Sequence, residues 1–337
     1  MSGLEILSLA GPASVQDGGR PGWQRWGVPE GGALDIHALA EGQALLGNAP
    51  DAAALEMPGA GGRFRAQAAM VVATSGAEMA LRVNGVARGW RSALALGPGE
   101  TLEIGAAREG AIGYLHLPGG IDAPVELGAR SAHRRAGLGL VPTAGDVLRP
   151  LGRGGVAGRS LPRPAHFDRR CIRAMWGPQS ALFDAASRAR FAAETWTATP
   201  FRDRQGIRIA AAGGPFEAAL GLTTLSEAVV LGDIQMLGTG EPVVLLADRQ
   251  PTGGYPRIAT AISADLPALV QMPPGTGFRF EMVDRATALA ARAALRAEIA
   301  ALPERVVPAP AEGLAAINLI GGVVRGDEGE EPHADRS

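Results

Sequence analysis

The chain has 337 residues, of which 46% are hydrophobic, and its formal net charge is -2. This length suffices for about two domains with buried cores, so we expect a soluble globular protein. A charge near zero without long runs of one sign argues against a nucleic-acid partner. All 32 basic residues are arginine. This excludes a Walker A loop, a Schiff-base lysine and a biotin carried on this chain.

Other broad classes are excluded by single features. Cys171 is the one cysteine, so the chain has no internal disulfide and no paired-cysteine metal site. The five histidines lack the spacing of a metal site, and we predict none. Met1–Leu9 lacks a basic, apolar leader pattern, and no stretch approaches about 18 apolar residues. We therefore expect a cytoplasmic protein that has no membrane partner.

The first part of the chain predicts a β structure. The 48 glycines and 25 prolines favour short strands joined by turns. Asp35, as an N-cap, and Gly47, as a stop signal, bound one predicted helix. Apolar or alternating runs predict strands at Met70–Ala73, Leu81–Val83, Leu94–Leu96, Thr101–Gly105 and Ile112–Leu117.

A second β region is expected after a linker. Leu151–Pro164 is rich in Gly, Arg and Pro without an apolar period. Strands are predicted beyond it at Cys171–Trp176, Gly206–Ala210, Val229–Met236, Val243–Ala247 and Phe278–Val283, with helices at Ser180–Phe191 and Asp284–Leu302. The predicted organisation is mainly β with a few helices: an N-terminal lobe (1–150), a linker (151–166), a C-terminal lobe (167–325) and a disordered tail (326–337).

Two segments carry more polar chemistry than a strand requires. Val15–Asp35 reads VQDGGRPGWQRWGVPEGGALD, and Ser226–Pro256 reads SEAVVLGDIQMLGTGEPVVLLADRQPTGGYP. The loop after Val243–Ala247 places polar side chains at a strand end, where binding sites commonly lie. A structural alternative stays open, because Asp17 and Arg20 also suit an ion pair inside a tight turn.

These segments resemble motifs of the second allophanate-hydrolase-type subunit family. That family includes the C subunits of 5-oxoprolinase, a sporulation kinase-inhibitor antagonist, and the matching half of the carboxyltransferase domain in urea carboxylase and urea amidolyase. GGID at Gly119–Asp122, LG-x-RS at Leu127–Ser131 and ISADLP at Ile262–Pro267 extend the resemblance over nearly the whole chain. The resemblance implies a cyclophilin-like β-barrel architecture in two lobes around a cleft.

The resemblance also implies a function. It indicates one component of an ATP-dependent 5-oxoprolinase, which converts 5-oxo-L-proline, ATP and water to L-glutamate, ADP and phosphate. The implied partners are a companion allophanate-hydrolase-type subunit 1 (the B component) and possibly a ring-opening protein (the A component). ATP with Mg²⁺ is the implied cofactor. We assign catalytic roles to Asp17, Asp248 and Arg249. Substrate-binding roles fall on Arg20, Trp23, Asp35, Arg204, Gln235, Gln250, Thr252, Gly253, Gly254 and Tyr255.

Two alternatives and several departures qualify this hypothesis. The chain could be the carboxyltransferase half of a split biotin-dependent urea or amide carboxylase, or a non-catalytic regulatory partner. Gly32 and Pro251 stand where the family usually has a hydroxyl side chain, and Arg202 replaces a serine. Because a site that loses hydrogen-bond partners discriminates against a polar substrate, we expect weak or no turnover of 5-oxoproline itself and better turnover of a related lactam or amide.

Overall fold

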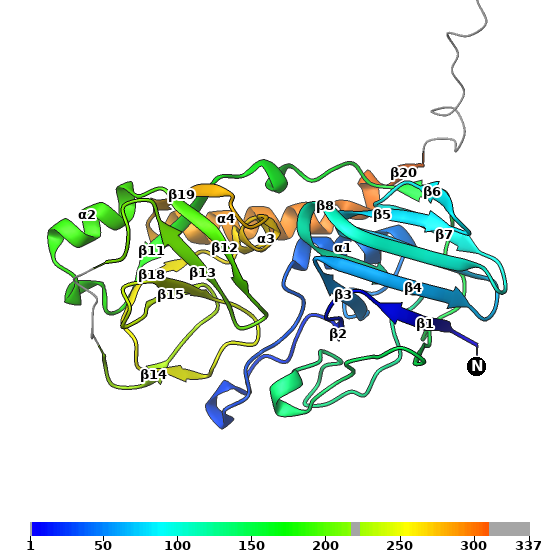
Figure 1. Cartoon of the computed structure of the whole chain (residues 1–337), viewed down its shortest axis with the longest axis horizontal. Coiled ribbons are helices and arrows are strands. Elements are labelled where there is room, and N and C mark those ends of the chain that lie inside the picture. The colour runs from blue at the N-terminus through cyan, green and yellow to red at the C-terminus, as the bar shows by residue number, and fades with distance from the viewer. Residues whose placement is uncertain (1, 217–222, 310–337) are drawn as a thin grey trace, which may run out of the picture.

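The computed structural model describes residues 2–216 and 223–309, which form two β assemblies (Figure 1). The first is a sheet that contains eleven strands within these residues. They are β1 (Leu4–Leu9), β2 (Ser14–Gln16), β3 (Ala54–Pro58), β4 (Ala60–Ala66), β5 (Met70–Val83), β6 (Val86–Arg88), β7 (Ser92–Leu96), β8 (Thr101–His116), β9 (Val147–Leu148), β10 (Arg159–Ser160) and β20 (Val307–Pro308).

The second assembly is a closed barrel in the order β11-β18-β15-β16-β13-β12-β19. Its strands are β11 (Cys171–Trp176), β12 (Trp196–Arg202), β13 (Gly206–Ala211), β15 (Asp233–Met236), β16 (Pro242–Leu245), β18 (Arg257–Ala261) and β19 (Gly277–Met282). A short pair, β14 (Glu227–Ala228) with β17 (Thr252–Gly253), forms a separate ribbon. The mainly β prediction is confirmed, whereas the cyclophilin likeness stays a prediction.

The sequence pattern divides two long strands that the structure keeps whole. Met70–Ala73 and Leu81–Val83 belong to β5, and the runs at 101–105 and 112–117 belong almost entirely to β8, which pairs with it antiparallel. The register shifts after Gly76, which has φ +73°. The glycine that interrupts the apolar pattern is therefore a bulge within a strand and not a turn between two strands.

Helix ends follow local capping signals closely. Helix α1 (Ile36–Leu46) begins after Asp35, whose carboxylate accepts the Ala38 N–H at 2.9 Å, and ends at Gly47 with φ +70°. Helices α2 (Ala185–Ala193) and α4 (Arg285–Ala300) are capped in the same way by Asp184 and Asp284. The predicted helix at Ser180–Phe191 therefore starts later than expected. Helix α3 (Leu266–Gln271) was not predicted, and the 3₁₀ turns are η1 (Gln24–Trp26), η2 (Arg134–Ala136), η3 (Ala165–Asp168), η4 (Ser180–Leu182) and η6 (Leu302–Arg305).

One strand is shorter than its apolar run. Within Val229–Met236 only β15 is extended, because the Asp233 N–H donates to the Val230 carbonyl at 3.2 Å and closes a turn. Gly232 in that turn has φ +89°, a conformation that glycine adopts without steric cost. The run is therefore a turn followed by a short strand.

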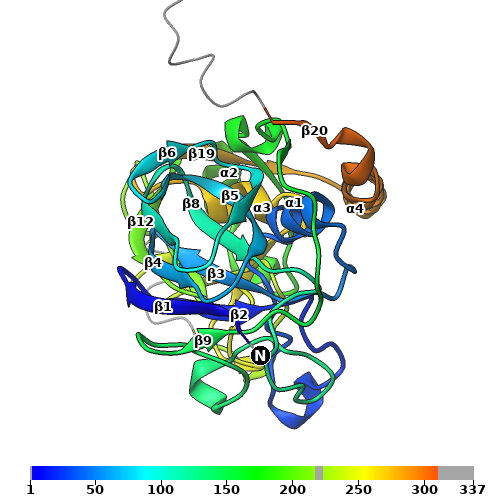
Figure 2. The same cartoon turned by 90° about the vertical axis from the view of Figure 1, so that its right-hand side faces the viewer.

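The two assemblies share buried apolar contacts. Aromatic side chains fill the barrel, and the Phe191 and Phe280 rings stack with centroids 5.2 Å apart. The same core continues into the first assembly through Leu34, Ala38 and Tyr114. Helix α4 contacts both β11 and α1, and it lies beside α1 in Figure 2. Part of the seam between the assemblies is therefore packed core.

The chain returns to the first sheet after the barrel. The segment predicted as a linker contributes β10, which pairs with β7 on one side and with β20 on the other. The lobe boundaries at 150 and 166 stay a prediction, and the tail 326–337 lies outside the described residues. None of the helices in 2–216 and 223–309 is long and apolar enough to cross a membrane.

Candidate functional site

The two polar segments, about 200 residues apart in the chain, meet at the seam. The Gln24 side-chain amide donates to the carbonyls of Val229 at 2.6 Å and Pro251 at 3.0 Å. The Gly31 N–H donates to the Ala247 carbonyl at 3.2 Å. The structure thus brings together the residues that the sequence marked separately.

Asp17 is held by backbone and hydroxyl donors at the start of this site. Its carboxylate accepts the N–H groups of Gly19 at 2.8 Å and Arg130 at 2.5 Å, and the Ser131 hydroxyl. Asp17 is buried, and these bonds fix the tight turn of the first segment. The catalytic role assigned to Asp17 stays a prediction.

Arg20 combines deep burial with an uncommitted donor. Its guanidinium donates to the carbonyls of Glu126 and Ser131, and its side chain is 1% exposed. Burial lowers the pKa of Arg20, and the charges of Asp17 and Asp248 oppose that shift. Its Nη1 atom has no hydrogen-bond partner among the described residues. Because Gly31 has no side chain, this nitrogen lies 3.2 Å from the position that a Cβ would occupy there.

Arg204 connects the two assemblies. From the loop between β12 and β13 it donates to both oxygens of Asp248 at 2.9 Å. It also donates to Glu56 Oε1 at 2.5 Å and to the Gly32 carbonyl at 2.7 Å, both in the first assembly. Burial alone would lower the pKa of Arg204, but the Glu56 and Asp248 carboxylates raise it above its ordinary value. The side chain predicted to bind substrate is therefore engaged by protein groups.

A buried polar chain continues from Glu56 to α1. The Tyr114 hydroxyl donates to Glu56 Oε2 at 2.7 Å and accepts the Asp35 N–H at 2.9 Å. Burial and the Glu56 charge raise the pKa of Tyr114. Gln271 of α3 donates to Asp35 Oδ2 at 2.8 Å and to the Ile112 carbonyl at 2.9 Å. Asp35, predicted to bind substrate, is fully buried as a helix cap and a connector between the assemblies.

Arg202, a departure from the family pattern, has a clear local role. Its guanidinium donates to the carbonyls of Val270 and, at 2.6 Å, Met272, at the C-terminal end of α3. Burial lowers its pKa to about 10. The arginine thus satisfies carbonyls that the end of a helix leaves without partners.

The loop after β16 supplies further donors. Arg249 is 2% exposed, and its Nη2 donates to the Gln24 side-chain oxygen at 3.3 Å. Burial lowers the pKa of Arg249. The Gln235 side-chain oxygen accepts from Gln250 at 2.9 Å. Within the part of the chain that the structure describes, Arg249 Nη1 and Gln235 Nε2 are buried without partners.

The remaining predicted residues lie at the edge of the site. Thr252 is exposed and pairs in β17, and Tyr255 is 40% exposed. A Cβ on Gly253 would lie 2.3 Å from Gln235 Nε2, so only glycine leaves room for that amide. The Gly254 carbonyl accepts the Thr224 N–H at 2.7 Å. Trp23 is half-buried against Trp26, with ring centroids 5.2 Å apart.

A cavity of about 320 Å³ lies at the seam, and its lining includes parts of both polar segments but none of the individually predicted site residues. Its walls include the backbone of Gly31 and Gly32 and the apolar side chains of Leu231, Leu246 and Leu266. Three polar residues that line it were not singled out from the sequence: Glu30, Ser263 and Arg292. Glu30 lies within a marked segment, whereas Arg292 lies in an Ala-rich helix whose periodicity predicted only an apolar face.

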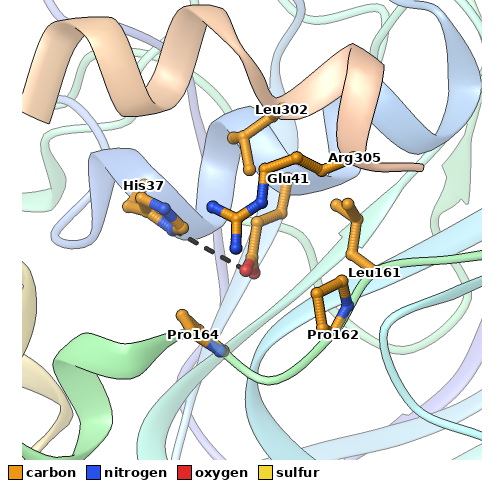
Figure 3. Close-up of a pocket in the computed structure, with 7 residues that line it drawn as sticks. All are labelled: His37, Glu41, Leu161, Pro162, Pro164, Leu302 and Arg305. Carbon is orange, nitrogen blue, oxygen red and sulfur yellow. Dashed lines mark ion pairs between the residues drawn. The ribbon is translucent and has the colours of Figure 1, made fainter.

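A second, much smaller cavity lies between α1 and η6 (Figure 3). Its volume is about 10 Å³, roughly the space of one water molecule. His37 there lies 3.6 Å from Glu41 and 3.3 Å from Glu298. In residues 2–216 and 223–309, no three His, Cys, Asp or Glu side chains gather in a geometry that could hold a metal ion.

Comparison with known proteins defines the class. The family described as "Carboxyltransferase domain, subdomain A and B" matches residues 26–282. The urea amidolyase of K. lactis shares the fold with a TM-score of 0.80 at 24% identity, over 91% of this chain and 21% of that one. The two β assemblies with their shared seam are thus a carboxyltransferase-type domain.

Curated relatives narrow the class further. The 5-oxoprolinase C subunit of Haemophilus influenzae is 34% identical over 83% of this chain and 91% of its own length. The Escherichia coli protein of the same name is 33% identical over 86% and 94%. The chain belongs to the carboxyltransferase-domain family that contains the C subunits of 5-oxoprolinase.

Proposed function

We propose that the chain is the C component of an ATP-dependent 5-oxoprolinase and acts with a companion B component and a ring-opening A component. The main support is its similarity, over most of both chains, to two proteins named as the C subunit of that enzyme. The contact between the two polar segments, which both contribute to the lining of one cavity, supports a substrate site at the seam. Within this proposal, ring opening consumes 5-oxo-L-proline, ATP and water and yields L-glutamate, ADP and phosphate.

The chemistry requires an activated lactam. Amide resonance makes the ring carbonyl a poor electrophile, and ATP supplies a phosphoryl group that converts its oxygen into a leaving group. The protein then has to orient the lactam and to stabilise negative charge. The uncommitted guanidinium nitrogens of Arg20 and Arg249 suit that second task, because buried charged donors bind phosphate and carboxylate oxygens strongly.

The same donors fit the phosphates of ATP better than they fit a metal ion. Arginine offers only N–H groups, whereas Mg²⁺ takes oxygen ligands and keeps several waters and nucleotide phosphates around it. Both oxygens of Asp248 already accept from Arg204. We therefore infer that Mg²⁺ enters bound to the nucleotide, and that Arg20 and Arg249 contact the phosphate oxygens of the nucleotide.

The proposal is tested by reconstitution. The chain is co-expressed with the A and B components, purified by size-exclusion chromatography, and assayed for ADP release with and without 5-oxo-L-proline. We expect co-elution with the B component and ADP release that depends on 5-oxo-L-proline, at a lower rate than with a related lactam because Gly32 and Pro251 lack the hydroxyls usual in the family. The proposal is contradicted if the chain and the B component elute separately at micromolar concentration. It is also contradicted if the rate of ADP release is the same with and without 5-oxo-L-proline.

A second function is favoured by the family description itself. A carboxyltransferase domain would accept CO₂ from carboxybiotin carried on another protein, since this chain has no lysine to carry biotin. The reconstituted proteins then carboxylate urea or a small amide only when a biotinylated carrier is supplied. ADP release that depends on 5-oxo-L-proline without any biotin carrier separates the two functions.

A further inference from the structure

Two opposite charges line the cavity at the seam without pairing. Glu30 approaches from the first polar segment, and Arg292 approaches from α4. No hydrogen bond or ion pair joins either side chain to another described residue, although the Glu30 charge acts on the buried guanidinium of Arg249. Both side chains therefore keep hydrogen-bonding capacity for a ligand.

The sequence around Arg292 explains why its guanidinium has no hydrogen-bond partner on the same helix. On a helix, residues three and four positions away are the possible partners. For Arg292 these are Ala288, Leu289, Leu295 and Arg296, none of which can accept a hydrogen bond from its guanidinium. Arg296, one turn further along, adds a like charge and does not line the cavity.

Glu30 is placed by its backbone. Its carbonyl accepts the Arg20 N–H at 2.7 Å, and the neighbouring Gly31 N–H donates to Ala247. These two bonds fix the segment on both sides of the seam, while the half-buried carboxylate is left without a donor from the described chain. A carboxylate accepts only, so it selects a ligand that has an N–H or O–H group.

Several of the other residues that line the cavity are apolar. Leu246 and Leu266 are 2% and 4% exposed, and Leu231 is half-buried beside them. A volume of about 320 Å³ falls at the lower end of small-molecule pockets. The cavity therefore suits a compact ring that carries both a hydrogen-bond donor and an anionic group.

We propose that Arg292 and Glu30 are the specificity residues of this cavity, where Arg292 binds the carboxylate of a small lactam acid and Glu30 accepts its ring N–H. This inference rests on the proposed function, since 5-oxo-L-proline has both groups. It assigns ligand recognition to α4, a helix outside the two polar segments. Arg292 and Glu30 are binding residues in this proposal, and the phosphoryl chemistry stays with the groups around Arg20 and Arg249.

The Arg292 contact is tested by direct binding, without turnover. Calorimetry on the full chain, alone and in complex with the B component, compares 5-oxo-L-proline with 2-pyrrolidinone, the same lactam without its carboxylate. We expect the wild type to bind the acid at least about tenfold more tightly. Arg292→Gln removes this preference and leaves 2-pyrrolidinone binding unchanged, whereas the matched control Arg296→Gln keeps the preference.

The Glu30 contact is tested with a second analogue. In 5-oxotetrahydrofuran-2-carboxylate a ring oxygen replaces the N–H, so the wild type should bind it several-fold more weakly than 5-oxo-L-proline. Glu30→Ala removes that difference, and Glu30→Gln, which keeps an acceptor oxygen, retains most of it.

Several results would overturn the inference. They are equal binding of the acid by Arg292→Gln and wild type, an equal loss in Arg296→Gln, or no binding of 5-oxo-L-proline at millimolar concentration in either the chain or the complex. The proposed function fails on a different readout, namely the absence of lactam-dependent ADP release from the reconstituted complex. A complex that hydrolyses ATP with 5-oxo-L-proline while Arg292→Gln keeps wild-type affinity refutes only the assignment to α4.

Discussion

Replacing Arg204 with methionine should destabilise the seam far more than an ordinary surface change would. Glu56 is fully buried, and among the described residues its Oε1 atom accepts from Arg204 alone. Leu34 N–H and the Tyr114 hydroxyl serve the other oxygen, so Arg204→Met leaves a buried carboxylate without its cation. Breaking a buried ion pair in this way typically costs about 3–5 kcal/mol of unfolding free energy.

The assay is urea unfolding followed by tryptophan fluorescence, together with the double variant Arg204→Met/Glu56→Gln. Glu56→Gln removes the charge of the fully buried carboxylate, while Asp248 still lacks its Arg204 partner, so we expect the double variant to recover at least about 1 kcal/mol relative to Arg204→Met. A loss below about 1 kcal/mol in Arg204→Met would refute a stabilising role of the buried Arg204–Glu56 ion pair. Unchanged stability with lost lactam-dependent ADP release would instead support the substrate-binding role assigned from the sequence.

Three further changes test other parts of the structure. Burial lowers the pKa of His116 from 6.5 to about 3. Between pH 6.5 and pH 3 the imidazole is therefore protonated only in the unfolded chain, so the unfolding free energy falls as the pH drops. His116→Asn should reduce the slope of unfolding free energy between pH 6 and pH 4 by up to about 1.4 kcal/mol per pH unit, and parallel slopes would contradict this. Gly32 has φ +88°, and the Cβ of Gly32→Ser would lie 3.1 Å from backbone atoms of Gly18 and Gly19. We expect this variant to lose about 1–3 kcal/mol of unfolding free energy, measured by thermal or urea unfolding. Unchanged stability would show that the turn can adjust. Asp248→Ala should lower lactam-dependent ADP release by about two orders of magnitude or more, and an unchanged rate at unchanged melting temperature removes Asp248 from the site.

The parts of the fold that were predicted correctly depend on local signals. Helix α1 begins and ends where its cap and its glycine indicate, because both act through neighbouring backbone groups. Strands β5 and β8 were divided because a glycine bulge and a glycine turn have the same local sequence. Helix α3 is short and its charge-free sequence lacks a polar face, so periodicity could not reveal it.

In the candidate site, too, only local sequence signals could be predicted. The two polar segments were found because their composition is unusual, and their contact through Gln24 agrees with a shared site. The Gln271 contact with Asp35 joins residues 236 positions apart, and no local pattern encodes it. Arg292 became a candidate only when the fold placed α4 against the cavity.

The pairing of β10 with β20 has a consequence for how the molecule is assembled. Arg159 lies opposite Pro308 and Ser160 opposite Val307, so the chain leaves the first sheet for the barrel and returns to it at the same bridge. The described residues between Leu161 and Val306 thus leave the first sheet and return to it at neighbouring points. This is the geometry of a domain inserted into a surface loop of a host, which here is the first β assembly. A short turn between Ser160 and Val307 would close the host without moving another of its strands, so the barrel is topologically removable even though its core is continuous with that of the host.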